Sequence, residues 1–257
     1  MTWTPFLTPF VTLFRKELRR FLKVWIHTVG APILTGFLYL VVFGEALSKH
    51  LPVYEGVSYT EFIIPGLIMM SVLQNAFSNT ASSFIQSKIS GNLVFILLPA
   101  IPGPQLAAAY ICASFVRAAL VGTGLYAVCA LWAAPPVASP LVLFSFAFCG
   151  AAIMASLGLI TALWAEKYDQ MGAVMNFVVV PLTFLSGVFY SVESLPPVGR
   201  TLSAFNPFFY LVDGFRQGFF GRGATDIGTS LVVVALTACV VTAAAVVLVT
   251  RGWKIRD

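Results

Sequence analysis

The sequence predicts an all-α integral membrane protein with six transmembrane helices. Of its 257 residues, 59% are hydrophobic and only 10% are charged, and the mean hydropathy is +0.91. Soluble domains carry about 25% charged residues, so this chain cannot cover a water-facing surface. Six apolar runs have roughly the 20 residues that a helix needs to cross a bilayer. These runs are 24–44, 62–84, 106–132, 141–164, 172–190 and 227–250.

The basic residues indicate how these helices are oriented. With the N-terminus in the cytoplasm, ten of the fifteen Lys and Arg residues lie on the cytoplasmic side and four lie outside. Cytoplasmic loops are the ones enriched in Lys and Arg, so the sequence predicts that both termini are cytoplasmic. The remaining basic residue, Arg117, lies inside the third run with no acid at matching depth. We expect its side chain to snorkel to the cytoplasmic interface.

The basic stretch before the first run predicts a helix over residues 8–23. Its Lys and Arg residues alternate with Phe and Leu at helical spacing. This pattern is typical of an amphipathic helix that lies in the headgroup layer of a membrane. A simple cluster of orienting charges is the alternative, and both interpretations can hold together.

Polar residues follow one face of the second run. The stripe comprises Ser71, Gln74, Asn75, Ser78, Asn79, Ser82 and Gln86, and it predicts either contacts between helices or the lining of a transport pathway. The fifth run repeats the pattern more weakly with Asn176 and Thr183, and Pro181 should kink it. The candidates for lining a pathway are Ser71, Asn75, Ser78, Asn79, Asn176 and Thr183.

The stretch NPFFYLVDGFRQGFFG, residues 206–221, predicts a helix too short to span a bilayer. Asn206 can cap it and Pro207 suits its first turn. Asp213 and Arg216 lie three residues apart and could pair on its surface. Three glycines, Gly214, Gly218 and Gly221, share a face that would let a neighbouring backbone approach closely.

Several functional classes find no support in the residues. The four Cys and two His are isolated and lack the spacing of a metal site. The sequence contains no HExxH, GxSxG or Walker A motif and no nucleic-acid-binding motif. We therefore expect no catalytic residue, no metal ligand and no ATP site in this chain.

Leu195-Pro196, then Pro207 to Tyr210, then Arg216 form a pattern that resembles the signature of ABC-2-type exporter permeases. The pattern lies just before the last apolar run, where that family carries it. The chain is most similar to the bacterial subgroup of YadH-like and nodulation permeases. The resemblance implies that 194–222 forms re-entrant helices at the external mouth of a pathway. Its gate residues would be Pro207, Tyr210, Asp213 and Arg216.

The resemblance also implies a cytoplasmic contact with an ATPase. Residues 87–98 occupy the position of the family's coupling helix, and 8–23 that of its connecting helix. The expected contacts are Lys88, Gly91, Asn92, Leu93, Arg19 and Arg20. Val94 and Phe95 stand where the family usually has acidic residues, so the contact should be more apolar than usual.

Taken together, the resemblance implies one transmembrane domain over 1–257 that acts as the permease subunit of an ATP-driven exporter in the bacterial cytoplasmic membrane. Two copies would pair with two separate ATPase subunits, which hold the ATP and Mg; this chain would bind no cofactor. An amide-lined apolar conduit suits an amphipathic lipid, glycolipid or hydrophobic drug. The alternatives are a polysaccharide exporter permease, a non-transporting scaffold and an ion-driven carrier; the carrier would usually need an acidic or histidine relay at mid-membrane.

Overall fold

The computed structural model describes residues 7–47, 56–98 and 101–254. These residues form helices joined by turns and loops, and the described ranges contain no strand. The α-helices are α1 Thr8–Lys23, α2 Ala31–Leu47, α3 Tyr59–Ile89, α4 Leu93–Leu97, α5 Gly103–Cys129, α6 Pro140–Trp164, α7 Tyr168–Val174, α8 Val180–Phe184, α9 Pro197–Ala204, α10 Pro207–Phe220 and α11 Ile227–Thr250. Two π-helices, η1 Ile26–Gly30 and η2 Met175–Val179, and a 3-10 turn, η3 Val192–Ser194, complete the set.

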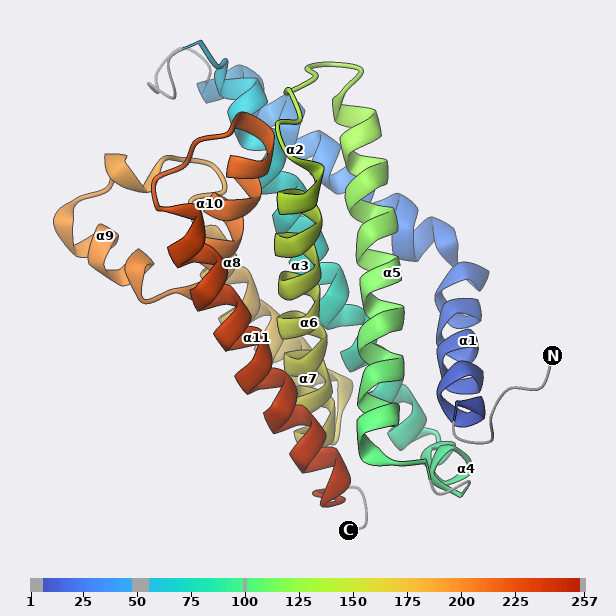
Figure 1. Cartoon of the computed structure of the whole chain (residues 1–257). Helices are drawn as coiled ribbons and strands as arrows, with labels where there is room; N and C mark the ends of the chain where they lie inside the picture. Colours follow the sequence, from blue (N-terminus) through green and yellow to red (C-terminus); the bar gives the residue numbers. More distant parts are fainter. Residues whose placement is uncertain (1–6, 48–55, 99–100, 255–257) are drawn as a thin grey trace.

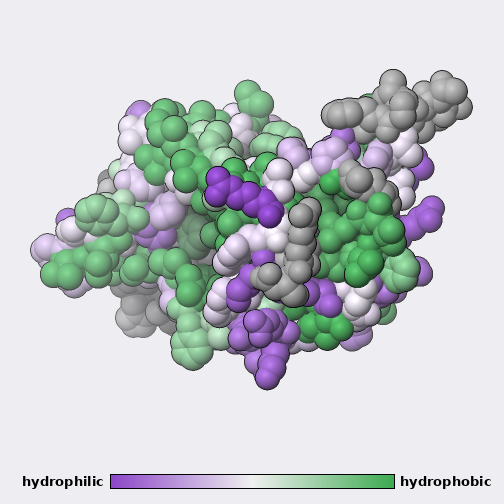
Figure 2. All heavy atoms as spheres, turned by 90° about the horizontal axis from the view of Figure 1, so that it is seen from below, coloured by the Kyte–Doolittle hydropathy of each residue, from purple (hydrophilic) through white to green (hydrophobic). Residues whose placement is uncertain are grey.

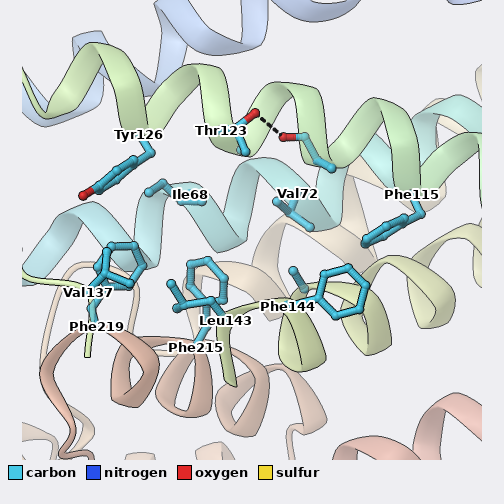
Figure 3. A pocket seen from close by; sticks show the side chains of 13 residues that line it. Ile68, Val72, Phe115, Thr123, Tyr126, Val137, Leu143, Phe144, Phe215 and Phe219 are labelled. Atoms are coloured by element: carbon cyan, nitrogen blue, oxygen red, sulfur yellow. Dashed lines mark hydrogen bonds between the residues drawn. The ribbon is translucent and has the colours of Figure 1, made fainter. Parts of the chain in front are cut away.

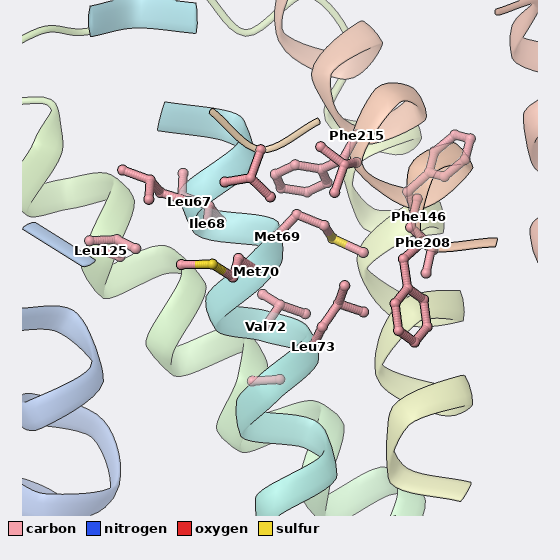
Figure 4. Packing of buried hydrophobic residues seen from close by; sticks show 14 of the residues in the cluster. Leu67, Ile68, Met69, Met70, Val72, Leu73, Leu125, Phe146, Phe208 and Phe215 are labelled. Atoms are coloured by element: carbon pink, nitrogen blue, oxygen red, sulfur yellow. The ribbon is translucent and has the colours of Figure 1, made fainter. Parts of the chain in front are cut away.

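Helix α3 is the centre of the bundle. In its most apolar window 83% of the residues are buried, against 11% for the first span and 17% for α11. It packs against α6, α5, α2 and α10. Leu67, Met69 and Leu73 of α3 are fully enclosed, and Figure 4 shows Met69 and Leu73 on the side of α3 that faces side chains of α6 and α10. The polar stripe therefore lies on the most buried of the five candidate spans.

Five helices within the described residues are long and apolar enough to cross a membrane. Four of them correspond closely to predicted runs, and α3 extends beyond its run to Ile89. A Ser58–Glu61 capping box begins α3: Glu61 N donates to Ser58 Oγ, and Ser58 N donates to the Glu61 carboxylate. Figure 1 shows α1 beginning, and α11 ending, at the same end of the bundle as α4.

The fifth predicted run departs from a regular span. α7, η2 and α8 follow one another without a break but stop at Phe184, so the prediction of a helix to residue 190 is wrong. Gly187 has a φ of +76° and turns the chain, and Val188 then packs its backbone against Gly66 of α3. The π-helix η2 lies directly before Pro181, which cannot donate a helical hydrogen bond.

The short helix predicted before the last span is α10, and its capping is confirmed. Asn206 Oδ1 accepts a hydrogen bond from Phe208 N, and Pro207 lies in the first turn. Gly221, at a φ of +69°, ends the helix in the left-handed conformation. Gly221 therefore provides the turn that ends α10, and it does not serve the close approach of a neighbouring backbone that the sequence predicted.

Helix α10 runs along only the N-terminal part of α6. Leu211 lies against Gly150, Gly214 against Phe146, and Ser139 N donates to Gly218 O. Because α6 begins at Pro140 and ends at Trp164, α10 covers less than half of it. Helix α10 is thus short and packs at one end of α6, as the sequence predicts for a helix that does not span a bilayer.

Candidate functional site: a polar cavity beside α3

The polar stripe of α3 opens onto a cavity of about 330 Å³. Helix α2 and η1 form one wall, α3 and α5 another, and Met175 of η2 borders it from the fifth segment. Three pathway candidates, Ser71, Asn75 and Ser78, line it. The other polar lining side chains are His27, Thr35, Tyr39, Gln74 and Arg117.

Asn79, the fourth candidate on α3, is fully buried and bonds within the bundle. Its Nδ2 donates to Ser114 Oγ of α5 at 2.9 Å. Its Oδ1 accepts from Arg20 at 2.7 Å and from Arg117 at 3.5 Å. Asn79 thus links α1, α3 and α5 and does not line the cavity.

Arg117 does not snorkel to the interface, so that prediction is wrong. Its side chain is 8% exposed; Nη2 donates to Asn75 Oδ1 at 2.9 Å and Nε donates to Thr28 O at 3.2 Å. Pro32 has no N–H with which to satisfy the Thr28 carbonyl in helical fashion. The partners of Arg117 are amide and backbone oxygens and not the acidic side chain that a buried arginine would suggest.

Helix α1 contributes an ion-pair cluster that the sequence did not single out. Glu17 is fully buried and pairs with Lys16 at 2.8 Å and with Arg20 at 3.0 Å. Arg20, expected at the ATPase contact, instead points into the bundle toward Asn79. Arg19 is exposed. The spacing of Glu17 and Arg20, three residues apart, was the available signal.

The two candidates on the fifth segment lie apart from the cavity. Asn176 is exposed on the surface of the bundle. It is next to Phe177, whose side chain is 82% exposed. Thr183 is buried, and its hydroxyl donates to Val180 O. Neither polar side chain of this segment therefore lines the cavity.

The charged residues of α10 hold neighbouring loops, and the expected Asp213–Arg216 pair is not formed. Asp213 accepts hydrogen bonds from Ala224 N, from Gln217 Nε2 and from both the N–H and the hydroxyl of Thr225. Arg216 donates to Gly187 O at 2.9 Å and lies 3.9 Å from the centre of the Phe62 ring.

Two further gate candidates, Tyr210 and Pro207, hold or begin α10. The hydroxyl of Tyr210 donates to Ala204 O at the end of α9, and Pro207 begins α10. Nδ2 of Asn206 donates to Leu182 O of α8 at 2.8 Å. The start of α10 is therefore tied to both α8 and α9.

The predicted coupling helix over 87–98 is not continuous. Helix α3 ends at Ile89, Gly91 turns the chain with a φ of +73°, and the short helix α4 follows. Lys88 Nζ donates to Leu163 O and Ala165 O at the end of α6, while Gly91 and Asn92 are exposed. Leu93 is buried.

The end of the molecule that carries α4 presents apolar side chains on its surface. Val94, Phe95 and Leu98 are 62%, 70% and 70% exposed. Figure 2 views the molecule from this end and shows hydrophilic residues standing between apolar areas. Such a mixed surface is typical of a protein contact.

A second, apolar cleft of about 230 Å³ lies on the other side of α3. Figure 3 shows Ile68 and Val72 of α3, Phe115 and Tyr126 of α5, and Phe215 and Phe219 of α10 around it. The sequence alone did not predict this cleft, because its walls form only when α3, α5, α6 and α10 pack together.

Comparison with known proteins agrees with this architecture. The profile of the family described as "ABC-2 type transporter" matches residues 8–220. The inner membrane transport permease YadH of Escherichia coli strain K12 is 36% identical over 220 residues, which cover 85% of this chain and 86% of that protein. Nodulation protein J of Rhizobium leguminosarum bv. viciae is 27% identical, with 81% of this chain and 83% of that protein covered.

Proposed function

The chain belongs to the ABC-2 type transporter family and is a membrane permease subunit of that class, and we propose that it moves an amphipathic substrate outward as a homodimer driven by two separate ATPase subunits. The similarity to an inner membrane permease supports a place in the bacterial cytoplasmic membrane. The ATP and Mg would be held by the ATPase.

The observation that carries this proposal is the cavity beside α3. Its walls come from the first, second and third spans and from the broken fifth segment, and eight of its thirteen lining residues are polar. Polar groups are costly in hydrocarbon unless partnered, so a cavity that gathers them suits the passage of a polar headgroup. Helix α10 would close the outer end of the route.

A second copy of the chain would cover the open side of this cavity. Leu34 and Leu38 of α2 are 58% and 52% exposed and Phe177 of η2 is 82% exposed, so this side is apolar beyond the cavity. An Asn176→Cys variant should crosslink between two copies, whereas Val240→Cys on exposed α11 should not. Absence of the Asn176 crosslink in every nucleotide state would contradict the dimer.

The ATPase would dock at α4. Apolar side chains that face water are stabilised by a covering partner, and Phe95 is the most exposed aromatic of this end. Lys16 and Arg20 border one pocket together with Phe95, and α1 begins and α11 ends at that same end (Figure 1). Because basic residues are enriched on the cytoplasmic side of a membrane, this arrangement supports cytoplasmic termini.

Copurification tests the docking. The tagged chain should capture an ABC ATPase from its own host cell, and Phe95→Asp should abolish the capture. Phe205→Asp is the matched control, since Phe205 is 84% exposed and follows α9, far from α4 (Figure 1). Capture that survives Phe95→Asp, or ATP hydrolysis by the purified chain alone, would overturn the proposal.

A further inference from the structure

Arg117 carries a buried positive charge whose described hydrogen bonds all go to neutral oxygens. They reach Thr28 O, Asn75 Oδ1 and Asn79 Oδ1, and the side chain is only 8% exposed. A guanidinium has five N–H donors, so these three bonds leave donors for another acceptor. Burying a charge without an opposite charge is costly.

The acid nearest to this cluster is already paired. Glu17 accepts from Lys16 and Arg20, and Arg20 shares the Asn79 oxygen with Arg117. Lys16 is 42% exposed, so water screens its charge. Arg20 and Arg117 against Glu17 then leave an excess of one positive charge in the buried group. In a medium of low dielectric constant this excess attracts an anion strongly.

The excess charge lies inside the bundle, away from the ends of the helices that hold Arg117 and Asn75. Arg117 lies near the middle of the 27-residue α5, and Asn75 near the middle of the 31-residue α3. Both border the polar cavity, and no Asp or Glu is among the residues that line it. Ser71, Gln74 and Ser78 add hydroxyl and amide donors along the same wall.

We propose that this cavity binds the oxyanionic headgroup of the transported amphiphile, with Arg117 as its principal ligand. The proposal rests on the transport function above and names its substrate class: an amphiphile that carries a phosphate, sulfate or carboxylate. The planar guanidinium fork matches the paired oxygens of such groups. Pro32, Met70 and Met175 supply apolar wall beside the headgroup.

The test compares amphiphiles of one chain length on the purified full chain in a neutral detergent. The probes are dodecyl phosphate, zwitterionic dodecylphosphocholine and inorganic phosphate, each titrated while thermal unfolding is followed by tryptophan fluorescence. The apparent affinity for dodecyl phosphate should exceed that for dodecylphosphocholine by about tenfold. Inorganic phosphate at equal ionic strength should have little effect; an equal effect would overturn the assignment to an amphiphile's headgroup.

Three variants test whether the preference for dodecyl phosphate over dodecylphosphocholine depends on Arg117. Arg117→Gln should abolish it, and Arg251→Gln, at an exposed arginine after α11, should leave it intact. Asn75→Asp keeps Arg117 and the shape of the side chain at position 75, but it places a carboxylate beside the guanidinium. This carboxylate neutralises Arg117 in place of the ligand, so the variant should also abolish the preference. This variant decides the matter if Arg117→Gln does not fold. A preference that survives Asn75→Asp, or that the wild-type chain lacks, would overturn the proposal.

The outcome separates this inference from the transport assignment. A chain that captures its ATPase but does not discriminate between the two amphiphiles remains a permease and loses only the anion site. A chain that discriminates between them but captures no ATPase keeps the anion site and loses the proposed coupling.

Discussion

Nη2 of Arg20 in α1 lies 2.7 Å from Oδ1 of Asn79 in α3 and 3.0 Å from the backbone oxygen of the same residue. Sequence analysis assigned these residues to different sites, Arg20 to the ATPase contact and Asn79 to the pathway. The hydrogen bonds join the two. A displacement of α1 would therefore act on α3 one turn of helix away from Asn75, at the wall of the cavity.

Arg20→Gln should loosen this connection. The variant loses the charge-assisted hydrogen bonds to Asn79 and the pairing with Glu17, which costs about 1.5–3 kcal/mol of unfolding free energy. We expect a lower midpoint of thermal unfolding and weaker stimulation of the ATPase by substrate. Arg19→Gln, at the adjacent exposed residue, is the matched control. Equal effects of the two variants would contradict the structural role of Arg20.

Glu17→Gln should destabilise the chain through the charges that it leaves behind. Glu17 is fully buried beside two cations, and removal of one partner of a buried pair leaves the other uncompensated. Because Arg20 is partly exposed, we expect a loss of about 2–3 kcal/mol. Lys16→Gln should have a much smaller effect, since Lys16 is 42% exposed and water screens its charge. The two variants are compared by chemical unfolding in detergent.

Local rules predicted the elements whose boundaries are set by nearby residues. The helix over 8–23 has the bounds of α1, and Asn206 and Pro207 begin α10 as expected. Caps, prolines and apolar periodicity act within one or two turns, so a sequence contains them in full.

Partners across the bundle could not be predicted in this way. Arg117 bonds to Asn75, 42 residues earlier in the chain, and to Thr28, 89 residues earlier. The end of the fifth segment at Phe184 depends on the turn at Gly187 and on its packing against α3. Hydropathy continues unbroken through LSGVFY, so a sequence window does not register that turn.

Asp213→Asn should loosen the loop before α11. The two carboxylate oxygens of Asp213 accept four hydrogen bonds from Gln217, Ala224 and Thr225. An asparagine would place an NH₂ group against some of these donors, which leaves them unsatisfied. We expect faster tryptic cleavage after Arg222 in the purified chain.

The control for this prediction is Asp226→Asn. Asp226 caps α11 through Thr229 N, and asparagine is an equally good cap, so the cleavage rate should remain that of the wild-type chain. Unchanged cleavage in Asp213→Asn would contradict the role of this carboxylate in holding the loop.

Gly214→Ala should disturb the packing of α10 on α6. A Cβ at Gly214 would collide with the ring of Phe146, which is 1% exposed and has little room to move. Overpacking of this kind costs about 1–3 kcal/mol. Gly172→Ala is the matched control, because a Cβ there meets nothing within 4 Å; replacing glycine within a helix should stabilise by about 0.5–1 kcal/mol. Phe146→Leu should partly restore the unfolding midpoint of Gly214→Ala by making room for the added methyl group. If both glycine variants lowered the midpoint equally, the contact between Gly214 and Phe146 would not be what holds α10 at the N-terminal half of α6.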